Sequence, residues 1–135
     1  VGRKRHILVD TQGWLLLLKV LPADKQDREG GEQLLQSLEQ RYGWLSKIWA
    51  DGGYSGKFET WVANLKRNRR IHLDIVKRNQ PASSFKVLPK RWIVERTFAW
   101  LGNSRRLARD YEKRLDHSES FIYISMAKRM LLTFA

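Results

Sequence analysis

Two isolated carboxylates have the residue type and the setting that metal-assisted phosphate chemistry requires. Asp51 ends the short apolar run LSKIWAD and is followed at once by GGYSG. Glu95 is the only acidic residue between Asp74 and Asp110, in a stretch rich in lysine and arginine. Carboxylate oxygens are the ligands that Mg²⁺ prefers, and two such ions can activate an attacking oxygen and stabilise a leaving one. The two residues therefore indicate a candidate divalent-metal site beside a phosphate-binding surface.

Each carboxylate also has a purely structural interpretation. An aspartate before two glycines is common in turns, so Asp51 could serve only to shape a loop. Glu95 follows Arg91 by four residues, and such an ion pair stabilises a helix by about 0.2–0.5 kcal/mol. Spacing alone does not separate these interpretations. The stretch GGYSGK is a poor match to a nucleotide phosphate loop, because Phe58 stands where serine or threonine would contact Mg²⁺.

The net charge of +12 is concentrated in one part of the chain. Residues 1–64 hold nine lysines and arginines against eight acidic residues, and residues 115–135 hold two against two. The basic segment of about 65–114 holds fifteen against four. A phosphate backbone favours such a concentration, so double-stranded DNA is the expected partner, with an acidic protein or an anionic membrane as alternatives.

Length and composition favour one folded domain over residues 1–135. There is no cysteine, which excludes disulfides and thiolate metal sites, and the three histidines are isolated and read as structural. No apolar stretch is long enough to cross a bilayer, so we expect a cytoplasmic protein without a membrane partner.

Hydrophobic periodicity predicts strands that alternate with helices. The order indicates the α/β class with a mixed sheet, and it places Asp51 at a strand end, where α/β sheets usually hold their chemistry. Asp116 and Glu119 form a potential capping box at the start of the last helix. The expected elements are strands at 6–9 and 14–21, a polar loop at 23–31, a helix at 32–43, a strand at 45–51, a helix at 57–68, a strand at 69–78, and helices at 90–107 and 116–134.

Four stretches carry a resemblance that covers essentially the whole chain in order: GRKRHILVDTQG, LPADKQDREG, ADGGYSG and LPKRWIVERTFAWLGNSRRLARDYE. Together they resemble the DDE transposases of bacterial insertion sequences, in the insertion-sequence-five-like branch. The resemblance implies a ribonuclease-H-like fold in which two aspartates and one glutamate bind two Mg²⁺ (or Mn²⁺) ions. It also implies cleavage of DNA at the ends of the element and strand transfer into a target.

The resemblance assigns roles by position. Asp51 matches the second aspartate and Glu95 the glutamate, so both are expected to be catalytic and to bind metal. Arg91 matches the arginine that contacts DNA phosphate. Where the wider group has a tyrosine and a lysine, this chain has Leu88 and Gly102. Contacts with the DNA backbone must therefore come from other residues. The expected DNA-binding set is Tyr54, Lys90, Arg91, Arg96, Arg105 and Arg106.

The first aspartate of the family lies on a strand upstream of GRKRHILVD, and Asp10 in the hairpin turn is a poor substitute. The resemblance therefore implies the C-terminal part of a catalytic domain, lacking the first strand. Expected partners are an upstream transposase polypeptide and further copies of the chain on DNA, in the bacterial cytoplasm at the nucleoid. Two alternatives stay open: a truncated remnant that binds DNA without cutting it, and an unrelated basic module in which Glu95 only pairs with Arg91.

Overall fold

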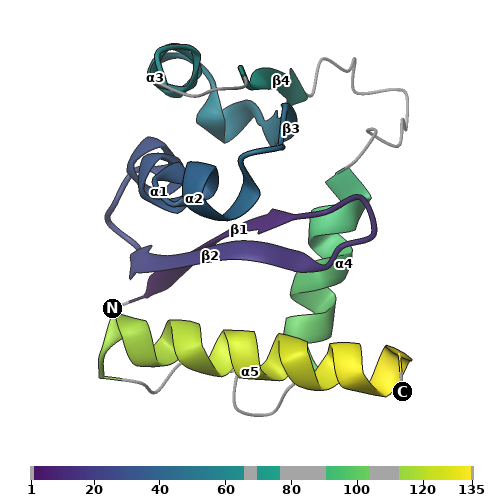
Figure 1. Cartoon of the computed structure of the whole chain (residues 1–135). Helices are drawn as coiled ribbons and strands as arrows, with labels where there is room; N and C mark the ends of the chain where they lie inside the picture. Colours follow the sequence, from purple (N-terminus) through teal and green to yellow (C-terminus); the bar gives the residue numbers. More distant parts are fainter. Residues whose placement is uncertain (1, 66–69, 77–90, 104–112, 135) are drawn as a thin grey trace, which may run out of the picture. The chain divides into compact units, whose positions relative to one another are not determined.

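The computed structural model describes residues 2–65, 70–76, 91–103 and 113–134, which form two compact units (Figure 1). The first unit combines Val1–Lys25 with Ile93–Ala135, and the second is Gln26–Trp92. The elements are β1 (Arg3–Val9), β2 (Leu15–Pro22), α1 (Asp27–Leu35), α2 (Leu38–Tyr42), β3 (Lys47–Asp51), the 3₁₀ turn η1 (Gly52–Tyr54), α3 (Lys57–Ala63), β4 (His72–Val76), α4 (Arg91–Gly102) and α5 (Leu115–Phe134).

The first unit is built on the antiparallel hairpin of β1 and β2, as the sequence predicts. The pairing runs from Arg3 opposite Pro22 to Val9 opposite Leu15. The Asp10 carboxylate closes the turn by accepting hydrogen bonds from the backbone N–H groups of Gln12 and Trp14, each at 2.9 Å. A side-chain oxygen that bonds nearby backbone N–H groups is the usual reason for aspartate in a turn.

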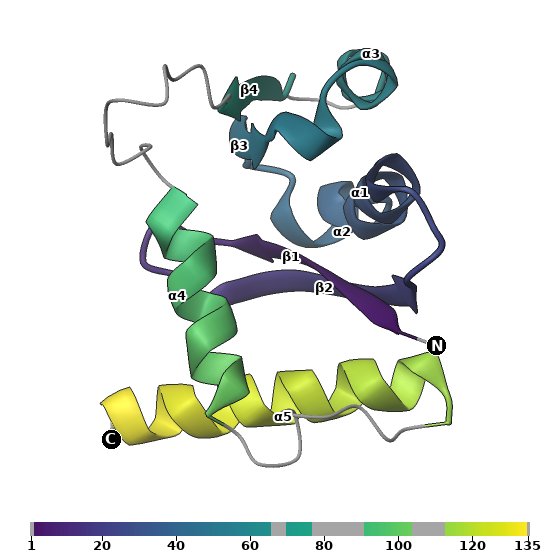
Figure 2. The same cartoon turned by 180° about the vertical axis from the view of Figure 1, so that it is seen from behind.

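Helix α5 packs along the hairpin, and both views show it there (Figures 1 and 2). Two of its side chains accept hydrogen bonds from β2, since Glu119 Oε1 lies 2.9 Å from the Val20 nitrogen and the Tyr123 hydroxyl 3.0 Å from the Leu18 nitrogen. These bonds satisfy backbone donors that a strand edge would otherwise expose. The expected capping role of Glu119 is therefore wrong, because its carboxylate reaches across to the sheet. The core of the unit consists of Leu18, Val20, Leu101, Ile122 and Met126.

The second unit surrounds the parallel pair of β3 and β4. Lys47 lies opposite His72 and Asp51 opposite Val76, so Asp51 occupies the carboxyl end of the pair. Gly31 of α1 allows close packing, because a Cβ at this position would lie 2.7 Å from an atom of the buried Phe58 ring. The buried apolar side chains of this unit are Leu34, Leu35, Leu38, Ile48, Phe58, Val62 and Ile71.

The structure confirms the α/β class but differs from the sequence prediction in detail. The described strands form two two-stranded sheets, one antiparallel and one parallel, so the single ribonuclease-H-like sheet stays a prediction. The predicted loop at 23–31 is partly helix, because Gln26 and Glu29 form a capping box that starts α1 at Asp27. The helix expected at 57–68 ends at Ala63. The ends predicted at 90 and 104–107 lie outside the described residues.

Candidate active site

Asp51 caps a turn and is also the last residue of strand β3. Its Oδ1 accepts a hydrogen bond from the Gly53 nitrogen at 2.9 Å, which caps the short turn η1. The residue is exposed at the carboxyl end of parallel strands, where α/β folds usually bind their ligands. The structural and functional interpretations of Asp51 are therefore compatible, since the turn holds the carboxylate in place at that end.

A second carboxylate, that of Asp27, approaches the same face of Gly53 as the Asp51 carboxylate. A Cβ added to Gly53 would lie 2.8 Å from Asp27 Oδ2 and 3.1 Å from Asp51 Oδ1. Only a residue without a side chain lets both carboxylates approach the backbone so closely. Sequence analysis missed Asp27 because it placed this residue in a loop. The signal that could have found it is the capping pattern of Gln26 and Glu29, which puts Asp27 in the first turn of a helix.

Burial and both carboxylates affect the pKa of the Tyr54 phenol. Burial raises the pKa of Tyr54 well above its ordinary value of 10.0, and the negative charges of Asp27 and Asp51 raise it further. Its ring packs against Phe58 with 5.5 Å between ring centroids. The expectation that Tyr54 contacts DNA stays a prediction, and any such contact would use a ring that is already partly packed.

We expect Tyr54 to make the free energy of unfolding depend on pH in the alkaline range. A phenol whose pKa is raised by folding contributes stability that is complete below pH 10.0, and this contribution is lost as the pH rises through the pKa of the folded state. The free energy of unfolding should therefore fall more steeply above pH 10.0 in the wild type than in Tyr54→Phe, which keeps the ring. Urea unfolding at several alkaline pH values would measure both slopes. Equal slopes would show that folding does not raise the pKa of Tyr54.

Glu95 lies on an exposed part of α4, whose opposite face is anchored to the hairpin. Ile93, Thr97 and Leu101 are buried at helical spacing. The Thr97 hydroxyl donates to the Gly13 carbonyl in the hairpin turn and is also 3.2 Å from the Ile93 carbonyl. These contacts fix the rotation of α4 and so turn Glu95 toward the surface.

The other predicted DNA-binding residues divide between described and undescribed parts of the chain. Arg96 is exposed, and its guanidinium lies over the Trp100 ring, 4.5 Å from the centroid. The backbone of Arg91 starts α4, but its side chain lies outside the described part, so its ion pair with Glu95 is untested. Lys90, Arg105 and Arg106 also lie outside the described residues. Asp51 belongs to the second unit and Glu95 to the first.

Comparison with known proteins decides the family. Residues 1–130 match the family described as the transposase DDE domain. The chain belongs to this family. It is also 31% identical over 129 residues to a protein of Burkholderia cepacia that is named as a transposase for insertion sequence element IS402. That alignment covers 90% of this chain and 59% of the relative, so the chain spans about three fifths of the relative's length. No solved structure matches the chain significantly.

DDE transposase domains generally use divalent metal ions, and the donors near Asp51 suit such an ion. Burial raises the pKa of the Tyr54 phenol, and the negative charges of the two carboxylates against Gly53 raise it further. Hard oxygen ligands of this kind are what Mg²⁺ and Mn²⁺ prefer. Within the described ranges, no group of three or more histidines, aspartates or glutamates is gathered closely enough to hold a metal.

Among the residues that the structure describes, no helix is both long and apolar enough to cross a membrane.

Proposed function

We propose that this chain forms part of a transposase that cuts DNA at the ends of an insertion sequence and joins those ends to a target. The observation that carries the proposal is the position of Asp51 in a chain whose residues 1–130 match the transposase DDE domain. Its exposed carboxylate lies at the carboxyl end of parallel strands, with Asp27 against the same glycine. The recombination of DNA by metal-dependent cleavage and strand transfer is the chemistry that this family membership favours.

In this proposal Asp51 and Glu95 hold divalent ions, Mg²⁺ or Mn²⁺. When bound, the ions would supply Lewis acidity toward a DNA phosphodiester. The turn at Gly53 fixes Asp51, and Thr97 fixes the rotation of the helix that carries Glu95. The same proposal includes two protein partners. One is an upstream transposase polypeptide that supplies a further carboxylate, and the other is a second copy of the chain bound to DNA.

The cationic residues have a separate role, which is to bind the DNA backbone. Arg96 is exposed, and a guanidinium can donate two parallel hydrogen bonds to a phosphate. The same role is proposed for Lys90, Arg91, Arg105 and Arg106 in the basic segment, and for the Tyr54 hydroxyl.

Titration calorimetry with Mn²⁺ tests the metal-binding part of the proposal. We expect Asp51→Asn and Glu95→Gln each to weaken binding by at least about tenfold, since even loss of an outer-shell partner of a ligand typically costs 10–100-fold. The matched controls are Asp24→Asn and Glu59→Gln, which remove the same charges from exposed positions elsewhere in the chain. Binding unchanged in both site variants, or reduced equally in the controls, would contradict the proposal.

A further inference from the structure

Two arginines from different helices converge on one indole ring in the first unit. The guanidinium carbon of Arg96, on α4, lies 4.5 Å from the centroid of the Trp100 ring. The guanidinium carbon of Arg129, on α5, lies 4.2 Å from the same centroid. Trp14 of the hairpin packs against Trp100 with 5.0 Å between ring centroids and a tilt of 32°, which holds the indole in place.

The described acidic residues do not neutralise these two guanidiniums. No carboxylate in the described ranges forms an ion pair with Arg96 or Arg129, and no described carbonyl or side chain accepts a hydrogen bond from either guanidinium. The Arg129 Nε atom is buried without a hydrogen-bond partner among the described residues. The acidic residues of α5 are engaged elsewhere, Asp116 with Arg114 and Glu119 with Val20 and Lys19.

This arrangement has a physical cost that an anion would offset. Two like charges near one ring repel each other, and each cation–π contact returns only about 0.5–1 kcal/mol at an exposed site. A stacked guanidinium is nevertheless pre-organised, because the ring fixes its plane and leaves its fork of donors ordered. An anion with several acceptor oxygens can satisfy two such forks at once.

We propose that Arg129 joins Arg96 in a binding site for a DNA phosphate, built on Trp100. This inference rests on the proposed function only in taking DNA as the source of the phosphate. It assigns a phosphate contact to the C-terminal helix, outside the basic segment of 65–114. Arg129 belongs to a stretch whose formal charges cancel.

The salt dependence of DNA binding tests this site. Each phosphate contact contributes about −0.9 to the slope of log K against log salt concentration, so removing one contact lowers affinity by about tenfold at 50 mM salt. We expect Arg129→Gln and Arg96→Gln each to show this loss and a slope that is shallower by about one. Fluorescence anisotropy of the 135-residue chain with a short labelled duplex, between about 50 and 200 mM salt, measures both quantities.

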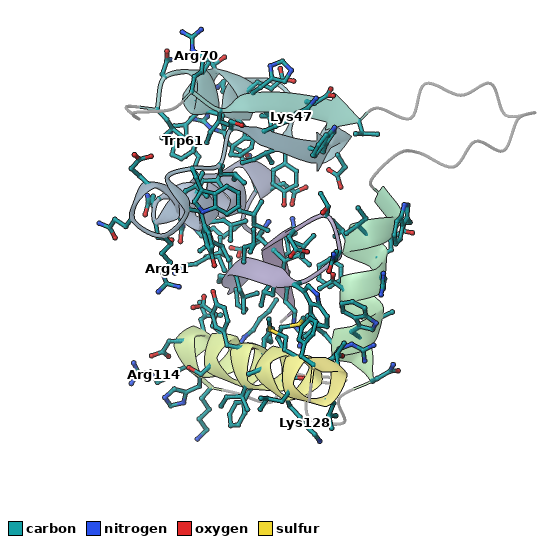
Figure 3. All side chains as sticks on the ribbon, turned by 45° about the vertical axis from the view of Figure 1, so that its right-hand side comes forward. Arg41, Lys47, Trp61, Arg70, Arg114 and Lys128 are labelled. Atoms are coloured by element: carbon teal, nitrogen blue, oxygen red, sulfur yellow. The ribbon has the colours of Figure 1, made fainter. Side chains whose placement is uncertain are left out.

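Lys128→Gln is the matched control, since it removes one charge from the neighbouring position. Lys128 is exposed and points away from the hairpin in Figure 3, on the outer side of α5. We expect this variant to keep the wild-type slope. Arg129→Lys should recover part of the salt slope but little of the affinity, because lysine keeps the charge without the planar fork. Thermal melting of each variant checks that the fold is retained.

The outcomes separate this inference from the proposed function. If the wild-type chain binds the duplex and folded Arg129→Gln keeps the wild-type slope, the phosphate site is wrong and the transposase proposal is untouched. An equal effect of Lys128→Gln also overturns the site, because it would indicate general attraction by net charge. If the affinity and slope change as expected while Asp51→Asn and Glu95→Gln leave Mn²⁺ binding unchanged, the site stands and the proposed metal chemistry fails.

Discussion

Replacing Ile122 with alanine should lower the free energy of unfolding by about 2–5 kcal/mol, the range for large-to-small changes at buried aliphatic positions. Ile122 is 0% exposed and belongs to the core that joins β2, α4 and α5. Truncation removes apolar contacts and leaves a cavity between three elements that cannot all close on it. Because typical domains are stable by only about 5–15 kcal/mol, this loss would be a large share of the total.

Ile124→Ala is the control for this prediction. It makes the same chemical change two residues later on the same helix, at a side chain that is 62% exposed. We expect its effect to stay within about 0.5 kcal/mol, as for most surface substitutions. Urea unfolding followed by far-ultraviolet circular dichroism measures both variants. Equal losses at the two positions would mean that α5 does not pack against the hairpin through Ile122.

The position of Asp51 could be predicted from the sequence, and its surroundings could not. An apolar run that stops at Asp-Gly-Gly indicates a strand followed by a turn, and β3 and η1 confirm it. The start of α1 was misassigned because DKQDREGG combines polar residues with two glycines, which is typical of a loop. One of those glycines is required by tertiary packing, since Gly31 leaves room for the Phe58 ring. No local pattern carries that information.

The arginine pair on Trp100 shows a second limit of sequence analysis. Residues 115–135 hold two basic and two acidic residues, so a count along the sequence gives no net charge and does not reveal a local excess. In the structure, Glu119 accepts from the Val20 backbone and Asp116 pairs with Arg114, while Arg129 lies over an indole ring. Charges that cancel in sequence are thus separated in space, because the two ends of α5 have different neighbours.

Replacing Gly53 with alanine should weaken Mn²⁺ binding about as much as Asp51→Asn does, by tenfold or more, while the fold is retained. The new Cβ would lie 2.8 Å from Asp27 Oδ2 and 3.1 Å from Asp51 Oδ1, so at least one carboxylate must turn away. The Asp27 carboxylate has the shorter contact and lies at the end of a rotatable side chain, so its movement costs little folding free energy. Metal binding is more sensitive, because ligand oxygens must be held in a defined geometry.

Gly52→Ala provides a control one residue away. A Cβ at Gly52 meets nothing within 4 Å, and neither glycine has the positive φ that would strain alanine. Gly52→Ala should therefore bind Mn²⁺ like the wild type, and both variants should melt within a few degrees of it. This pair tests whether the close approach of the carboxylates to Gly53 matters to the metal. If Gly53→Ala binds Mn²⁺ as the wild type does, the arrangement of carboxylates around Gly53 is irrelevant to metal binding.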